Sequence, residues 1–244
     1  MDDPPVSGPG GLRLIDHVAL EWTSVVANCT MNRERVLDGG NGYGRELGVE
    51  PLAFLKARLG QQEEVAWLDM CCGRGRALSI AAEQLETEGL RHRFFLHGVD
   101  LVGGFDRRGA QDPPDFHEAS LHRWAASRSY DLITCIHGLH YLGDKLGALA
   151  RAVGWLKNDG LLLAHLDLDS IRIDDVDARP WLGRALRRQG LTYNAQRRLV
   201  RGKGTRSIRW GLAYVGADPH AGPNYTGQPA VNAYYRVEAE PAKQ

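Results

Sequence analysis

Residues 65–78 read Val65-Ala-Trp-Leu-Asp69-Met-Cys-Cys-Gly73-Arg-Gly75-Arg-Ala-Leu78 and carry the strongest structural signal in the chain. An apolar run ends at the acidic residue Asp69, a turn with two glycines follows, and a helical pattern begins. Glycines let the backbone of such a turn approach a ligand closely. The unpaired N–H groups at the start of the helix attract a carboxylate, and Asp69 could hold an ammonium group. The segment therefore predicts a strand–turn–helix site for a ligand with an amino-acid end.

Short apolar runs alternate with helical patterns on both sides of this segment. Such alternation is typical of βαβ units built around a parallel sheet, and runs that are apolar throughout suit strands covered on both faces. The strands are predicted at residues 65–68, 94–99, 130–136 and 161–166. The helices are predicted at residues 51–59, 77–87, 145–156 and 180–189. The sequence therefore predicts an α/β fold.

Both ends of the chain depart from this alternation. Residues 191–200 and 207–215 flank Gly202-Lys-Gly204, which predicts an antiparallel β-hairpin. Apolar residues within 12–28 recur at helical spacing, which predicts an N-terminal helix. The sheet is thus expected to be mostly parallel, with an antiparallel hairpin at its C-terminal end.

The composition is that of an ordinary globular protein, with 43% hydrophobic and 25% charged residues and a formal net charge of zero. A neutral chain has no overall attraction to nucleic acid or to an anionic membrane, and no apolar run approaches the length that spans a bilayer. The four cysteines, Cys29, Cys71, Cys72 and Cys135, lack the spacing of a zinc site. These features predict a reduced, cytoplasmic protein that contains no metal site.

The quoted segment resembles motif I of the class I S-adenosylmethionine (SAM)-dependent methyltransferases, which reads roughly Leu-Asp-x-Gly-Cys-Gly-x-Gly. This chain has Leu68-Asp69-Met70-Cys71-Cys72-Gly73-Arg74-Gly75, with Cys71 in place of the first glycine. A dinucleotide site is the competing interpretation of a glycine-rich turn. Its third glycine, which allows close helix–strand packing, would fall at Leu78. The resemblance therefore implies SAM, held by Asp69, Cys71, Gly73 and Gly75.

Three later segments match further motifs of that family, in the right order. The resemblance implies that Asp100, followed by Leu101 after the second strand, binds the ribose hydroxyls. It also implies that Glu118 and Ala119 line the adenine edge. Residues 130–142 resemble the fourth motif and place His137 beside the cofactor. Residues 155–163 resemble the turn before the fifth strand, with Asn158-Asp159 in place of Pro-Gly.

The N-terminal part of the chain fits the helical lid of many small-molecule methyltransferases. The resemblance implies that Tyr43 or Arg45 reaches the SAM carboxylate, for which an arginine offers a charge-assisted fork. We expect a disordered tail at residues 1–11, a helical cap at 12–60 and a Rossmann-like, SAM-binding catalytic domain at 61–244.

Methyl transfer needs the acceptor held behind the methyl group and, for a hydroxyl or ammonium acceptor, a base. His137 and His140 follow the fourth strand, at the edge where ligands bind in such sheets, and histidine titrates near neutral pH. We predict His140 or His137 as the base, with Tyr141 shaping the pocket. His165 and Asp167, which end the fifth strand, are predicted to line the acceptor side.

The sequence predicts a methyltransferase that acts on an O or N atom of a small molecule or peptide, with specialised metabolism as the expected setting. We expect it to be a monomer or homodimer. Two alternatives stay open. The arginine-rich stretch 184–209 could serve an RNA or protein methyltransferase, although the segment typical of base methylation does not follow the fourth strand. Cys71 in the glycine turn would also suit a catalytically silent SAM-binding partner subunit.

Overall fold

The computed structural model describes the greater part of the chain. It covers residues 11–27, 35–40, 42–107, 109–174, 176–225 and 227–238. The tail predicted at residues 1–11 lies outside this part, apart from Gly11, and so does Cys29.

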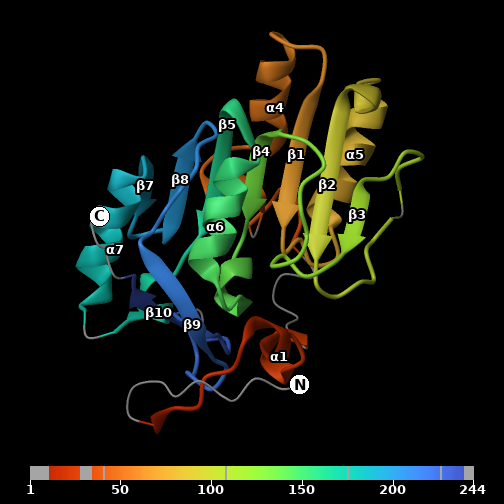
Figure 1. Cartoon of the computed structure of the whole chain (residues 1–244). Coiled ribbons are helices and arrows are strands. Elements are labelled where there is room, and N and C mark those ends of the chain that lie inside the picture. The colour runs from red at the N-terminus through yellow and green to blue at the C-terminus, as the bar shows by residue number, and fades with distance from the viewer. Residues whose placement is uncertain are drawn as a thin grey trace.

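A seven-stranded sheet forms the centre of the fold, in the order β3-β2-β1-β4-β5-β8-β7 (Figure 1). The first five strands of that order are parallel, whereas β8 and β7 run antiparallel to their neighbours. This arrangement confirms the α/β fold and the mostly parallel sheet with antiparallel strands at its C-terminal end. The bounds are β1 Val65–Met70, β2 Phe94–Asp100, β3 Asp115–Glu118, β4 Tyr130–Cys135, β5 Leu156–His165, β7 Leu191–Asn194 and β8 Leu199–Lys203.

Helices cover both faces of the sheet because its central strands are apolar on both sides. The side chain of Trp67 packs in one buried cluster with residues of α4 and α5, and that of Leu68 packs in another with residues of α6 and α7. The longer helices are α4 Pro51–Leu59, α5 Arg76–Thr87, α6 Lys145–Gly154 and α7 Ala178–Arg188. Short 3₁₀ turns follow at η2 Arg91–Arg93, η3 Gly138–Tyr141 and η4 Leu168–Ser170. In the described ranges, no helix has the length and apolarity needed to cross a bilayer.

The predicted hairpin around Gly202–Gly204 is wrong. Residues 191–203 form an antiparallel hairpin of their own, made of β7 and β8. In the turn between the two strands, the Asn194 side chain accepts a hydrogen bond from Arg197 N at 3.0 Å. Arg198 closes that turn with a φ of 49°. The next strand, β9 Leu212–Asp218, joins β10 Asn232–Val237 and β6 Ile171–Ile173 in a separate three-stranded sheet. Residues 191–200 were long enough to contain a turn that lacks glycine, which the sequence pattern did not reveal.

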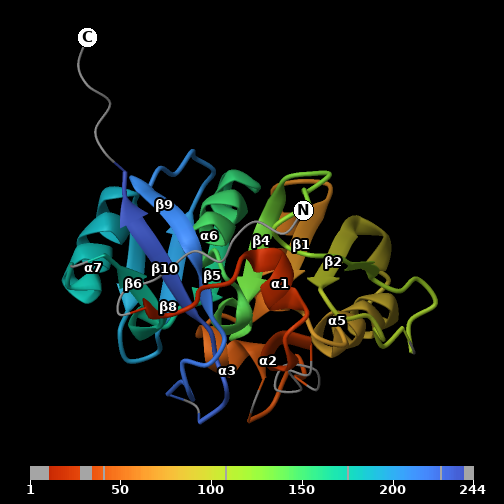
Figure 2. The same ribbon diagram turned by 60° about the horizontal axis from the view of Figure 1, so that its bottom comes forward.

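The predicted N-terminal helix is also interrupted. The Asp16 side chain accepts a hydrogen bond from Ala19 N at 2.8 Å and begins a short helix, α1 His17–Glu21. A second short helix, α2 Ser24–Ala27, follows, and α3 Tyr43–Leu47 comes after a gap in the described residues. Before α1, the backbone of Ile15 pairs with that of Ala217 in β9. Figure 2 shows that α1 lies over the carboxyl ends of the central strands.

One buried carboxylate joins the opposite edge of this sheet to α4. The Asp131 side chain, 0% exposed, accepts hydrogen bonds from Ala66 N at 2.8 Å and Gln62 Nε2 at 2.6 Å. It also pairs with Arg58 at 3.0 Å and Lys157 at 2.7 Å. Burial alone would raise the pKa of Asp131, but the bonds from Lys157 and its other partners hold that pKa below its usual value. The carboxylate therefore stays ionised and fastens four segments of the chain together.

Asp131→Ala should lower the free energy of unfolding by about 3 kcal/mol, because it leaves buried donors and cations without their partner. Asp159→Ala is the matched control, since Asp159 pairs with the same Arg58 but is 58% exposed; exposed pairs contribute less than about 1 kcal/mol. Urea denaturation measures both. An equal loss in the two variants would contradict this account.

Candidate functional site

A pocket lies at the carboxyl ends of β1, β2 and β3, with an empty volume of about 690 Å³ including its mouth. The carboxyl edge of such a sheet is where ligands bind in open α/β folds. Six residues predicted to act at the site line it, namely Cys71, Gly73, Asp100, Leu101, Ala119 and Tyr141. We call it the first pocket.

The turn between β1 and α5 forms one wall of the first pocket. Gly73 and Gly75 have φ angles of 60° and 72°, which L side chains rarely adopt. A Cβ on Gly75 would also collide with the ring of Phe116. Cys71 stands where the resembling family has glycine, and it too has a positive φ of 54°. The turn thus keeps the glycine-type conformation although a side chain is present at Cys71.

Asp100 fixes this turn from the neighbouring strand. Its Oδ2 accepts a hydrogen bond from Gly73 N at 2.9 Å, and its Oδ1 accepts one from Val102 N at 3.0 Å. An ionised carboxylate has about four acceptor sites. Asp100 therefore holds both turns together at the wall of the first pocket.

Asp69 lies behind the turn and is 1% exposed. Its Oδ2 accepts a hydrogen bond from Tyr43 Oη at 2.6 Å, and its Oδ1 accepts one from Thr134 Oγ1 at 2.6 Å. Burial raises the pKa of Asp69 to about 7, although the bonds from Thr134 and Tyr43 oppose the shift. In this arrangement Asp69 fastens Tyr43, and with it α3, to the end of β1. Its contact with a ligand's ammonium group stays a prediction.

Two other predicted residues also point elsewhere among the described residues. The Arg45 side chain is directed at Gly40 O, at 2.9 Å. The Glu118 side chain is exposed and lies over Gly103. For Tyr43, Arg45 and Glu118 the cofactor role stays a prediction.

The N-terminal segment forms the roof of the first pocket, but through other residues than the predicted Tyr43 and Arg45. His17, Leu20 and Glu21 of α1, with Val26 of α2, line the first pocket. Glu21 holds the roof in place, since its carboxylate accepts a hydrogen bond from Ser120 Oγ and lies 3.6 Å from Arg123. The helical spacing of apolar residues within 12–28 predicted a helix there, but nothing local showed that this segment would cover a pocket.

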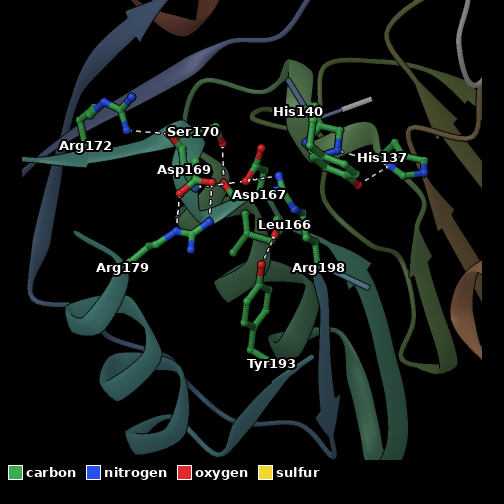
Figure 3. Close-up of polar contacts among 11 residues, drawn as sticks. His137, His140, Leu166, Asp167, Asp169, Ser170, Arg172, Arg179, Tyr193 and Arg198 are labelled. Carbon is green, nitrogen blue, oxygen red and sulfur yellow. Dashed lines mark hydrogen bonds and ion pairs between the residues drawn. The ribbon is translucent and has the colours of Figure 1, made fainter. Parts of the chain in front are cut away.

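A second pocket lies beyond the ends of β5 and β8, with an empty volume of about 760 Å³. Asp167 and Arg198 pair across it at 2.8 Å, and the Arg198 guanidinium lies 3.8 Å from the centroid of the Tyr225 ring. In Figure 3, Asp167 and Arg198 lie between the ion pair of Asp169 with Arg179 and the two histidines, His137 and His140. Asp167 therefore lines a cavity on the predicted acceptor side, whereas Arg198 and Tyr225 were not predicted.

A histidine–glutamate cluster of Glu46, His137 and His165 stands next to Tyr225. His137 Nε2 and His165 Nε2 lie 3.6 Å and 3.8 Å from Glu46 Oε2. His137 Nδ1 lies 3.1 Å from Tyr225 Oη and 3.3 Å from His140 Nε2. A hydrogen bond from His137 lowers the pKa of Glu46 to about 2. The α3 carboxylate thus orients an imidazole that lies between the two pockets.

His140 and His165 are held neutral by their surroundings. Burial lowers the pKa of His140 well below its usual value and that of His165 to about 3. The Nδ1 atom of each has no hydrogen-bond partner among the described residues. A buried polar atom without a partner is rare in proteins, so each Nδ1 could accept a hydrogen bond from a ligand, while the lowered pKa values make both rings weak bases.

The ligand atoms of the histidine–glutamate cluster all lie within 4.8 Å of one another, so the cluster is also a candidate metal site. The rings of His137 and His165, however, are stacked with their centroids 4.3 Å apart and their planes at 8°. An ion bound in the plane of one ring would lie well outside the plane of the other. The stacked rings of His137 and His165 therefore disfavour a metal ion at this cluster.

The raised pKa of Asp69 predicts that the free energy of unfolding depends on pH. Its pKa is about 7 in the folded protein but about 4 in an unfolded chain, so between these values the folded state binds more protons. This group alone therefore makes the free energy of unfolding fall as the pH rises from about 4 to about 7. Asp69→Asn cannot titrate and should lack this contribution.

Urea denaturation of wild type and Asp69→Asn at about pH 5 and about pH 8 measures this effect. The difference between the two proteins should change by at least about 1 kcal/mol in favour of Asp69→Asn at the higher pH, since one pKa unit corresponds to about 1.4 kcal/mol. Comparing the two proteins cancels the titration of other groups. A difference independent of pH would show that Asp69 is not perturbed.

The chain matches a known protein family. A family model described as a methyltransferase domain matches residues 43–201. Trans-aconitate 2-methyltransferase of Pseudomonas aeruginosa (strain UCBPP-PA14) is 31% identical over 165 residues, which is 62% of this chain and 60% of the relative. Aklanonic acid methyltransferase DauC of Streptomyces sp. (strain C5) is 31% identical over 101 residues, 38% of this chain and 44% of the relative. The chain thus spans about half the length of these relatives.

Two solved structures show a more distant similarity. The plantazolicin methyltransferase BpumL, in complex with a pentazolic desmethylPZN analog and SAH, has a TM-score of 0.44 at 20% identity, covering 63% of this chain and 59% of its own. The N-methyltransferase NodS of Bradyrhizobium japonicum WM9, in complex with SAH, has a TM-score of 0.41 at 16% identity, covering 78% and 98%.

Proposed function

We propose, from the premise that this chain belongs to the class I SAM-dependent methyltransferase family, that it moves a methyl group from SAM to an O or N atom of a small molecule or peptide. Specialised metabolism is the setting that we infer for this reaction. The observation that carries the proposal is the first pocket, because the glycine turn and Asp100 meet there at the carboxyl edge of the sheet.

The residues of the first pocket fit the parts of SAM. The turn from Cys71 to Gly75 offers a bare backbone and a helix start to the methionine carboxylate. Asp100 lines the pocket and presents to the ribose a carboxylate, a group that accepts hydrogen bonds from hydroxyl groups. Leu101 and Ala119 offer small apolar surface to the adenine, and α1 would cover it. Bound SAM supplies a methyl group on a positively charged sulfur.

The second pocket suits the acceptor. Tyr225 lines it and contacts His137, and Gly138, which follows His137, lines the first pocket, so the two pockets approach each other near His137. The two curated relatives are named for trans-aconitate and aklanonic acid, both of them organic acids. Arg172 lines the second pocket and offers its guanidinium group to such a molecule.

The arginine-rich stretch supports a small acceptor rather than nucleic acid, because several of its side chains bind the protein itself. Arg206 donates to the carbonyl groups of Gln189 and Gly190, both at 2.7 Å. Arg197 donates to Arg45 O at 3.1 Å, and Arg198 pairs with Asp167. These three guanidinium groups are bound by the protein itself, which leaves fewer of the stretch's cations for phosphate groups.

Holding the acceptor at near-attack distance can supply about 7–11 kcal/mol of the barrier. For a hydroxyl or ammonium acceptor, His140 or His137 would take the proton. His140 is neutral and has an unpartnered Nδ1. His137 is oriented by Glu46 through Nε2 and presents Nδ1 to Tyr225. Tyr141 lines the first pocket beside them.

Asp100→Ala should weaken the binding of S-adenosylhomocysteine (SAH) by about 10- to 150-fold, since a hydrogen bond to a charged group contributes about 1.5–3 kcal/mol. Isothermal titration calorimetry with SAH measures it. Asp112→Ala is the control, because its carboxylate is 67% exposed, pairs with Arg91 and does not line the first pocket. Its affinity should change much less. Normal SAH binding by Asp100→Ala would mean that SAM lies elsewhere.

His140→Gln should reduce turnover by about 100-fold or more if the acceptor must lose a proton, while SAH affinity changes little. Tyr225→Phe is the companion variant, because it keeps the ring beneath Arg198 but removes the hydroxyl that contacts His137. Turnover is measured with methyl-labelled SAM and a host extract. Unchanged turnover in His140→Gln would exclude it as the base.

The same labelling experiment tests the proposed function itself. We expect label in a low-molecular-weight compound or a peptide. SAH binding without transfer to any fraction would indicate a silent partner subunit. Label recovered in RNA, with binding that weakens as salt rises, would indicate a nucleic-acid methyltransferase.

A further inference from the structure

A second set of metal-ligating side chains lies away from both pockets, on the edge of the sheet formed by β2 and β3. His97, Asp115 and His117 each bring one ligand atom within 4.8 Å of the others. Asp115 lies opposite His97 in the register of the two strands, and His117 lies opposite Val99. Since side chains two apart on a strand share a face, all three project from the same face of this edge.

The ring planes distinguish this set from the histidine–glutamate cluster. The rings of His97 and His117 meet at 75°, with centroids 6.0 Å apart, so they are not stacked. Their planes intersect, and one ion can therefore lie in the plane of both rings. His117 Nε2 and Asp115 Oδ2 are 3.3 Å apart. Two ligands that lie about 2.0–2.1 Å from a tetrahedral zinc ion are separated by about 3.3 Å.

Tyr130 prepares His97 to act as a ligand. Tyr130 Oη lies 2.8 Å from His97 Nδ1, so an ion would take the other nitrogen, Nε2. Metal-binding histidines are commonly oriented in this way by a hydrogen bond to their second nitrogen. His97 is 7% exposed, so the packing around it also limits the movement of its ring.

The charges nearby partly oppose a cation. Arg91 and Arg128 both act on His97. The charge of Arg91 is offset by Asp112 at 3.5 Å, and the guanidinium of Arg128 lies over the Phe95 ring at 3.2 Å from its centroid. Asp115 supplies the negative charge in direct contact with the site. Two imidazoles and one carboxylate therefore favour a transition metal over Mg²⁺ or Ca²⁺, which prefer oxygen ligands alone.

We propose that His97, Asp115 and His117 bind a divalent transition-metal ion, with Zn²⁺ as the representative, and that water completes its coordination. The ion would join the edge strand β3 to β2. Just beyond β3, Ala119 N donates to Asp100 O at 2.9 Å and lines the first pocket. The ion would thus stabilise the strand that leads into that pocket.

Calorimetric titration of the chelator-treated full chain with ZnCl₂ tests the proposal. We expect one site in the wild type, no binding at that site in His117→Ala or Asp115→Asn, and binding weakened about 10- to 100-fold in Tyr130→Phe. Zinc should also raise the melting temperature of the wild type but not of His117→Ala. The Asp115 side chain is 61% exposed, so Asp115→Asn should fold normally.

Two variants serve as controls. His220→Ala removes an exposed histidine after β9 and should bind zinc as the wild type does. His165→Ala removes a member of the histidine–glutamate cluster and should also leave zinc binding intact. The proposal is overturned if the wild type binds no zinc, if His117→Ala and Asp115→Asn still bind it, or if only His165→Ala loses it.

Discussion

The candidate site depends on one carboxylate that joins two turns. β1 and β2 pair in parallel with Asp69 opposite Gly98, so the turns that follow them emerge at the same edge of the sheet. Asp100 accepts the N–H groups of Gly73 and Val102 there. These backbone donors would otherwise need water or a ligand. Because the protein satisfies them itself, the shape of the turn is set before any ligand arrives, which lowers the entropic cost of binding.

The same turn contains a conformation that its sequence does not favour. A residue other than glycine in the left-handed region costs about 1–2 kcal/mol, and Cys71 occupies that region. The structure accommodates the side chain by means of another glycine, since a Cβ on Gly138 would collide with that of Cys71. The missing glycine of the turn is therefore matched by one after β4. This contact also brings η3, and with it His140, close to the turn.

The sequence predicted the central elements well because each of them is determined by its own residues. The helix predicted at 51–59 is α4 with the same bounds, since Pro51 begins it and its apolar residues repeat at helical spacing. The strands at 94 and 130 also begin as predicted, because they are buried on both faces. Errors arose where partners distant in sequence decide the structure. Ile15, predicted in a helix, pairs instead with Ala217 about 200 residues later.

The candidate site was predicted only in part for the same reason. Gly73 and Asp100 belong to local motifs, so the sequence identified them. Glu46 meets His137 and His165 only after folding, and Tyr225 reaches His137 from a loop 88 residues further along the chain. No spacing rule relates such residues. The proposed metal ligands are related in the same way. His97 and His117 become neighbours only through the register of β2 and β3, and no cysteine spacing indicates them.

The covers of the two pockets are physically connected. The roof of the first pocket begins just after Ile15, whose N–H and C=O bond to Ala217 in β9 at 3.0 Å and 2.8 Å. β9 pairs with β10, which begins at Asn232, a residue that lines the second pocket. Since backbone hydrogen bonds hold neighbouring strands in register, the segment that leads into α1 and the strand that reaches the second pocket are held in one backbone ladder.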